Sequence, residues 1–237
     1  MPYLCRLLAV SALLSLAIIS SSPPALLAAD SWKAGAAKTT ITPKEPMWMA
    51  GYASRDHVAE GKSTELTGKA LVLEDPAGKR AALITLDLIG IDRTLSQDIC
   101  SQLEKKYGLA RDQVAINSSH THSGPVVARN LGPIHYLLIS PEQKKQVDDY
   151  AQFLEEKVIA VVGEALKNLA PANITWGSGK ATYAVNRRTN VEAKVPELRA
   201  AGLLKGPVDH DVPVLAVRTP EGKLVAITFG YACHATV

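Results

Sequence analysis

Two histidines separated by one residue are the clearest chemical feature of the sequence. His120 and His122 lie in the segment SSHTHSGP (residues 118–125), which directly follows a predicted strand. Side chains alternate along an extended chain, so both imidazoles would point to the same side. Such a pair can bind one metal ion together, or one imidazole can bind the metal while the other contacts a substrate. The alternative is a polar loop in which the two histidines have no functional role.

Further candidates follow two other predicted strands. His234 comes just after the last strand, among small residues, and reaches the same site if its strand neighbours the one before His120; its context alone favours a structural histidine. Arg187 follows an earlier strand, and a guanidinium can hold a carboxylate or an amide oxygen through a forked hydrogen bond. With Arg188 it equally fits a surface basic pair. His210 lies between two aspartates after a glycine-proline turn, which indicates a solvated turn rather than a metal site.

Hydrophobic periodicity predicts the elements that hold these residues. Strands are expected at residues 33–41, 69–74, 80–87, 113–117, 174–185, 212–217 and 224–231, and helices at 94–107 and 141–169. The second helix has apolar residues at intervals of three and four, typical of a helix with one buried face. This order predicts an α/β fold in one domain: a mixed β-sheet with helices packed outside.

Residues 1–29 have the pattern of an export signal. Arg6 precedes a largely apolar stretch, Leu7–Ile19, and small residues ending in Ala29 close the segment. The apolar stretch is too short to span a bilayer, which takes roughly 20 residues. We therefore expect a signal peptide at 1–29, export to the periplasm or secretion, and a mature domain at 30–237.

The composition excludes several classes of protein. The 237 residues are 47% hydrophobic and 21% charged, which is unlike a disordered tail, a collagen or a disulfide-dense miniprotein. A net charge of +3 without a basic run, with only 5% aromatic residues, argues against a nucleic-acid partner. Cys100 and Cys233 could pair in an oxidising compartment, but their spacing does not demand it, and we expect two free, buried thiols.

Four segments together resemble the neutral, non-lysosomal ceramidases. They are MAGY at 49–52, LITLDLIG at 83–90, SHTHSGP at 119–125, and Asn186-Arg187 followed by the hairpin that ends at Cys233-His234. The HTHSGP segment is the most specific of them. Their order and spacing match the first half of that family's catalytic domain, and the resemblance covers essentially all of the mature chain.

The resemblance implies a function and a role for each candidate residue. The family hydrolyses the amide of ceramide (N-acylsphingosine) to a fatty acid and sphingosine with one zinc ion. By resemblance, His120 and His234 are zinc ligands, His122 and Arg187 contact the reacting substrate or its oxyanion, and Gly51 lies at the pocket mouth against the substrate. Zinc, a proton-carrying imidazole and an arginine suit the cleavage of an unreactive amide. A lipid amide substrate also implies contact with a membrane or micelle surface.

The resemblance further implies two zinc ligands, a Glu and a Tyr, from sequence beyond His234, together with a C-terminal β domain. We therefore expect the chain to be the N-terminal part of a longer enzyme, with an incomplete catalytic domain that binds zinc weakly alone. Arg188-Thr189 replaces the Ser-Pro common in ceramidases, so another amide or ester remains open as the substrate. The alternatives are a different exported metallohydrolase and a non-catalytic truncated module. The sequence argues against two other metallohydrolase types that use a His-x-His pair. A metallo-β-lactamase would carry Asp-His where this chain has Gly124-Pro125. An amidohydrolase barrel would need repeated strand–helix units, which the sequence does not show.

Overall fold

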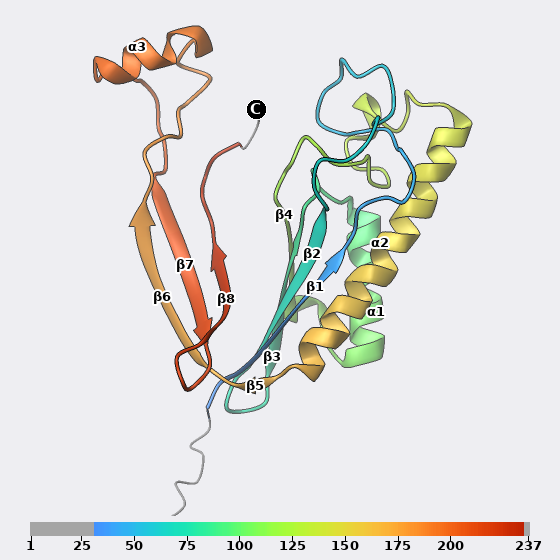
Figure 1. The fold of residues 1–237 in the computed structure, drawn as a ribbon, viewed down its shortest axis with the longest axis vertical. Helices are drawn as coiled ribbons and strands as arrows, with labels where there is room; N and C mark the ends of the chain where they lie inside the picture. The colour runs from blue at the N-terminus through green and yellow to red at the C-terminus, as the bar shows by residue number, and fades with distance from the viewer. Residues whose placement is uncertain (1–30, 235–237) are drawn as a thin grey trace, which may run out of the picture.

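A computed structural model describes residues 31–234. Figure 1 shows a layer of long helices, a large sheet and a small sheet, one behind the other. The signal peptide predicted at residues 1–29 lies outside the described residues. The main elements are β1 (Lys33–Thr40), β2 (Thr67–Glu74), β3 (Arg80–Leu86), α1 (Arg93–Tyr107), β4 (Val114–Ser118), α2 (Pro141–Lys167), β5 (Ala170–Pro171), β6 (Asn173–Lys180), α3 (Val195–Ala200), β7 (Asp211–Arg218) and β8 (Leu224–Phe229). Three short 3-10 turns are η1 (Arg111–Gln113), η2 (Gly132–Ile134) and η3 (Glu192–Lys194).

The large sheet has the order β4-β3-β2-β1-β5. Strands β1, β2 and β3 are antiparallel neighbours, whereas β4 runs parallel to β3 after the crossover through α1. The parallel register pairs Leu86 with Ser118, so β3 and β4 end at the same edge of the sheet. The loops that follow these two strands therefore meet there, and one of them carries His120 and His122.

Both helices cover one face of the large sheet (Figure 1). The Asp92 side chain accepts a hydrogen bond from the Leu95 amide at the start of α1, and Gly108 ends the helix in the left-handed conformation. Ser140 and Gln143 form a reciprocal capping box at the start of α2. The apolar faces of both helices and the covered face of the sheet form the main core.

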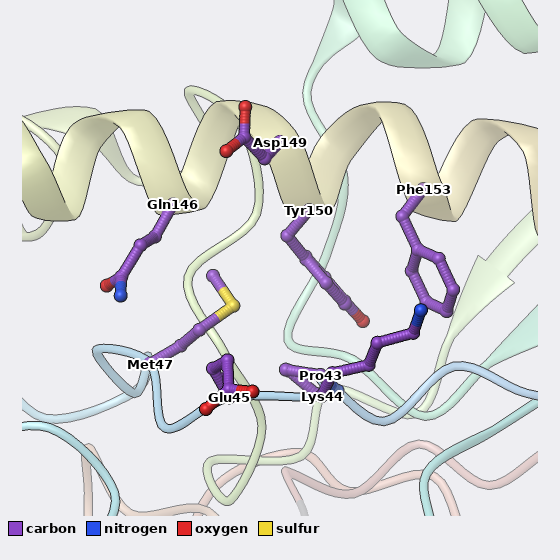
Figure 2. A pocket seen from close by; sticks show the side chains of 8 residues that line it. All are labelled: Pro43, Lys44, Glu45, Met47, Gln146, Asp149, Tyr150 and Phe153. Carbon is purple, nitrogen blue, oxygen red and sulfur yellow. The ribbon is translucent and has the colours of Figure 1, made fainter.

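The N-terminal half of α2 is anchored to the chain just after β1. The Tyr150 hydroxyl donates to the Ile41 carbonyl at 2.7 Å in a buried position, and burial raises the pKa of this phenol. Figure 2 shows a pocket of about 290 Å³ beside this contact, between α2 and the segment after β1. Its lining residues are Pro43, Lys44, Glu45, Met47, Gln146, Asp149, Tyr150 and Phe153.

The expected mixed sheet with outer helices is confirmed, but the last three strands form a separate antiparallel sheet of order β6-β7-β8. Val217 of this small sheet is fully buried against Ala34, Leu71 and Ala172, on the face of the large sheet that the helices leave open. A strand was expected as far as Val185, but β6 ends at Lys180. From there the chain enters an excursion that carries the short, unexpected helix α3 and returns at β7 (Figure 1).

The two cysteines of the described residues are both free, as expected. Cys100 is buried on α1, but Cys233 is exposed, so the expectation of two buried thiols is wrong for Cys233. Among residues 31–234, no helix is both long enough and apolar enough to cross a membrane.

Candidate metal centre

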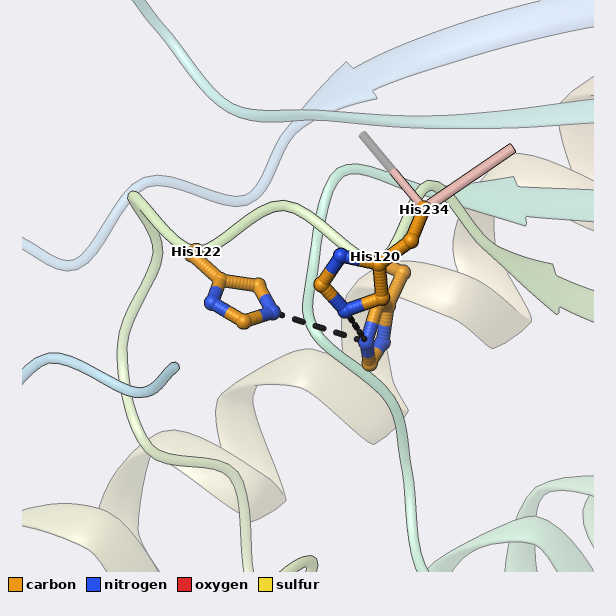
Figure 3. Close-up of side chains that lie close together, drawn as sticks. All are labelled: His120, His122 and His234. Atoms are coloured by element: carbon orange, nitrogen blue, oxygen red, sulfur yellow. Dashed lines mark hydrogen bonds between the residues drawn. The ribbon is translucent and has the colours of Figure 1, made fainter. Parts of the chain in front are cut away.

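Three imidazole rings converge at the edge where β3 and β4 end (Figure 3). The Nε2 atom of His120 lies 3.1 Å from Nε2 of His234 and 3.5 Å from Nε2 of His122. One nitrogen from each ring can be chosen so that all three lie within 4.8 Å of one another. The rings meet edge to face, with centroids 4.8 to 5.1 Å apart. This geometry lets three nitrogen lone pairs point at one metal ion.

His120 is held by a bond to the neighbouring loop. Its Nδ1 lies 2.7 Å from the Ile89 carbonyl in the loop after β3. A carbonyl oxygen only accepts, so Nδ1 carries the proton and Nε2 is left with its lone pair free. A backbone carbonyl on the second ring nitrogen is the usual arrangement for a metal-binding histidine, because it fixes the tautomer and the ring orientation.

His120 and His122 converge, but not because they lie on an extended strand. Strand β4 ends at Ser118, and His120 has φ +57°, in the left-handed region. The expected alternation of side chains along an extended segment is therefore wrong at this position. A tight turn after the strand brings the two rings together instead.

His234 reaches the same site from the small sheet. It lies five residues past the end of β8, whereas His120 follows β4 in the large sheet. The two strands are not neighbours in one sheet, so the expected route is wrong although the expected meeting of the side chains occurs. The small sheet must pack against the large sheet for the His234 side chain to reach His120.

The loop after β1 lines the other side of His122. Met49 forms an antiparallel bridge with Pro125, and the Ala50 amide donates to the Gly124 carbonyl at 2.9 Å. Gly51 follows with φ +108°, and a Cβ atom at Gly51 would lie 2.5 Å from both Cβ and Cγ of His122. The motifs around residues 49–52 and 119–125 are therefore neighbours in space. Gly51, expected at the pocket mouth, lies directly against the His122 ring.

Two further side chains of the same loop contact His122. The Tyr52 ring meets the imidazole edge to face at 5.0 Å between centroids. Arg55 Nη2 donates to the His122 carbonyl at 2.7 Å. Desolvation lowers the pKa of His122, and the nearby His120, His234 and Arg55 side chains lower it further. A histidine whose pKa is lowered from its usual value near 6.5 is neutral at pH 7 and has a lone pair available.

His135 belongs to the surroundings of the site although its sequence context gives no signal. The side chain is 1% exposed, and its Nε2 accepts a hydrogen bond from the Gly51 amide at 3.1 Å. Burial lowers the pKa of His135, and Arg55 and His122 lower it further. A lone histidine in a loop has no spacing to interpret, so only the packing of η2 against residue 51 identifies it.

Arg187 lies on the exposed excursion between β6 and β7. Its Nη2 atom is 3.2 Å from Glu192 Oε2, and within residues 31–234 no hydrogen bond joins it to the three histidines. The Asp209 side chain accepts from the Asp211 amide, the local turn expected around His210. The geometry thus brings together His120, His122, His234 and Gly51, and leaves Arg187 paired with Glu192.

The model of the neutral/alkaline non-lysosomal ceramidase family, N-terminal part, matches residues 32–237. The chain belongs to this family. The resemblance seen in the four sequence segments is therefore confirmed.

Relatives and solved structures agree with this assignment. The chain is 32% identical to a neutral ceramidase of Drosophila pseudoobscura pseudoobscura over 97% of its length, and 29% identical to neutral ceramidase 3 of Arabidopsis thaliana over 59%. A solved ceramidase complexed with C2 superposes with TM-score 0.69, and the neutral ceramidase from Pseudomonas aeruginosa with 0.67. Both solved structures are 23% identical to the chain over 87% of its length.

The match covers only part of each relative. The chain spans 32% of the Drosophila protein, 19% of the Arabidopsis protein and 32% of each solved structure.

Proposed function

We propose that this chain carries part of the active site of a zinc-dependent amide hydrolase that cleaves N-acylsphingosine to sphingosine and a fatty acid. The observation that carries the proposal is the convergence of His120, His122 and His234 in a chain of the ceramidase family. Because the chain spans about a third of its relatives, we also propose that groups outside residues 31–234 complete the site.

The donor set fits zinc. Imidazole nitrogens are among the ligands that zinc prefers, and His120 Nε2 has its lone pair free because Nδ1 donates to Ile89. We assign the metal to His120 and His234, whose Nε2 atoms are 3.1 Å apart. When bound, zinc supplies Lewis-acid polarisation of the amide carbonyl and makes water a nucleophile near neutral pH.

His122 is the candidate for moving the proton. Its Nδ1 is buried without a hydrogen bond of normal geometry, unlike that of His120, which argues for a role other than metal ligand. With its pKa lowered, the neutral ring can take a proton at Nε2 from the attacking water and pass it to the leaving amine.

Arg187 is the candidate for holding the substrate oxygen, because a guanidinium stabilises a developing oxyanion. For this role it must exchange its exposed partner Glu192 for the substrate. The excursion between β6 and β7 would then have to bring residue 187 toward the histidines. We propose Arg187 as a contact made in the complex with substrate.

The substrate class suggests where the protein works. We propose an exported protein that meets its lipid amide at a membrane or micelle surface. The apolar stretch Leu7–Ile19 supports export. Near the site, the segment that holds His135 exposes four large apolar side chains, which supports contact with lipid. They are Leu131, Ile134, Leu137 and Leu138.

Zinc binding and turnover test the proposal together. The unaltered protein, His120→Ala and His234→Ala are compared for zinc content and for hydrolysis of N-acylsphingosine in detergent micelles. We expect zinc affinity to fall more than about 100-fold in both variants, beyond the loss typical of removing an outer partner. His57→Ala, at an exposed histidine of the loop after β1, is the matched control and should change neither quantity.

The outcomes separate the alternatives. Zinc retained by both alanine variants would contradict the assigned ligands. The unaltered protein could also bind zinc and cleave other acyl amides or esters but not N-acylsphingosine. That result would show that the protein is a different metallohydrolase. A folded protein that binds no zinc, even when the chain is extended by the sequence expected to supply the remaining ligands, would indicate a non-catalytic module.

A further inference from the structure

His135 is a buried histidine that the proposed reaction does not use. Its Nε2 accepts the Gly51 N–H at 3.1 Å, and an accepting nitrogen carries no proton. The ring is therefore neutral with its proton on Nδ1. That Nδ1 is itself buried and has no hydrogen-bond partner within the described residues.

A buried polar ring with one unsatisfied nitrogen is an unfavourable choice for filling space. Leaving a buried donor unpaired is energetically unfavourable, and an apolar ring of similar size would avoid that penalty. What His135 supplies and an apolar residue cannot is an acceptor for the Gly51 amide. Gly51 has φ +108°, a conformation that glycine adopts readily and other residues rarely, so the hydrogen bond from its amide to His135 is what fixes the position of this peptide.

The backbone at Gly51 in turn packs directly against the His122 side chain. A Cβ atom built on Gly51 would lie 2.5 Å from the Cβ and Cγ atoms of His122 and 2.7 Å from its Nδ1. The backbone and the imidazole are thus in direct contact on the side of the ring opposite Nε2. A shift of the Gly51 peptide by a few tenths of an ångström would change where Nε2 points.

We propose that His135 is a positioning residue that fixes the Gly51 peptide and, through it, the orientation of the His122 imidazole. The proposal rests on the proposed function, because it matters for catalysis only if His122 moves the proton. His135 does not touch the metal ligands or the substrate in this arrangement. Removing outer groups that orient a metal site typically lowers activity or affinity about 10- to 100-fold.

Two variants of His135 distinguish the effect of losing the hydrogen-bond acceptor from the effect of changing the volume of the side chain. His135→Phe keeps an aromatic ring and loses the acceptor, whereas His135→Gln places an amide oxygen near the position of Nε2. We expect kcat to fall about 10-fold or more in His135→Phe with KM little changed, and His135→Gln to recover most of the loss. His57→Phe makes the same substitution at an exposed histidine of the loop after β1 and should leave kcat unchanged.

Nitrogen-15 NMR of the imidazoles gives a readout that does not depend on turnover. In the unaltered protein we expect His135 to carry its proton on Nδ1 and none on Nε2. In His135→Phe the His122 signals should shift, while those of the exposed His57 stay in place. A protonated Nε2 at His135 in the unaltered protein would overturn the proposal even if the phenylalanine variant does not fold.

A folded His135→Phe with unchanged kcat and unchanged His122 signals would overturn it as well. If the unaltered protein binds zinc but cleaves no N-acylsphingosine, the proposed function fails. The NMR result then still decides whether His135 positions His122.

Discussion

Gly51 determines how closely the loop after β1 can approach the His122 ring. Any side chain at this position would meet His122 at 2.5 Å, and φ +108° is itself costly for residues other than glycine. We expect Gly51→Ala to lower kcat at least about 10-fold by displacing the His122 ring, an effect of the size seen when outer partners of a metal site are removed, and to change zinc affinity little because His122 is not an assigned ligand. Turnover of N-acylsphingosine and isothermal titration with zinc measure the two quantities.

Gly61→Ala is the matched control for this substitution. Gly61 lies in the same loop, and a Cβ atom there would meet no heavy atom within 4 Å. It should bind zinc and turn over substrate as the unaltered protein does. Equal behaviour of the two variants would show that the contact between Gly51 and His122 does not matter for the site.

The sequence predicted the histidines of the site better than their surroundings. The spacing of His120 and His122 identified these two residues, whereas His234 was identified through the family resemblance. The turn at His120 and the partner of Gly51 were not predictable, because both depend on how loops pack rather than on local pattern. His135 shows this limit, since its role comes from one hydrogen bond across 84 positions in the chain.

At the level of elements, local periodicity located nearly every helix and strand to within a few residues. It did not separate β6, β7 and β8 from the large sheet, because strand pairing is decided by contacts between distant segments. The short helix α3 was missed because its six residues are too few for an apolar period of three and four to repeat. Parallel pairing of β4 with β3, which brings the site loops together, likewise follows only from the three-dimensional arrangement.

Gly35 in β1 sets how closely α2 can lie on the large sheet. A Cβ atom at Gly35 would lie 2.0 Å from the Ala165 carbonyl oxygen and 2.8 Å from the Leu169 amide nitrogen, both backbone atoms. Backbone cannot swing aside as a flexible side chain can, so Gly35→Ala must push the end of α2 away. We expect the free energy of unfolding to fall by about 3 kcal/mol, at the upper end of typical overpacking costs.

Urea unfolding measures this loss, with Gly177→Ala as the control. Gly177 lies in β6, where a Cβ atom would meet no heavy atom within 4 Å. Alanine there should be neutral or stabilising by up to about 1 kcal/mol, because glycine is the weaker residue in a strand. A Gly35→Ala protein as stable as the Gly177→Ala protein would contradict the close approach of α2 to β1.

On the scale of the whole molecule, two sheets bring together the three histidines of the candidate metal centre. The large sheet supplies His120 and His122 through the loop after β4, and the small sheet supplies His234 through the segment after β8. The two sheets meet through a small apolar cluster centred on Val217, which packs against Ala34 and Leu71. The distance between the two halves of the site therefore depends on a contact that includes no site residue.

Val217→Ala tests whether this contact controls the metal centre. Val217 is fully buried, so the truncation should lower the free energy of unfolding by about 2 kcal/mol, as expected for a core substitution that leaves a cavity. Val158→Ala removes the same two methyl groups from a fully buried position of α2, in the main core away from the small sheet, and should cost a similar amount. If docking of the small sheet positions His234, zinc affinity should fall severalfold in Val217→Ala and remain unchanged in Val158→Ala. Equal zinc affinity in two variants of equal stability would mean that the segment after β8 holds His234 at the site without help from the contact between the sheets.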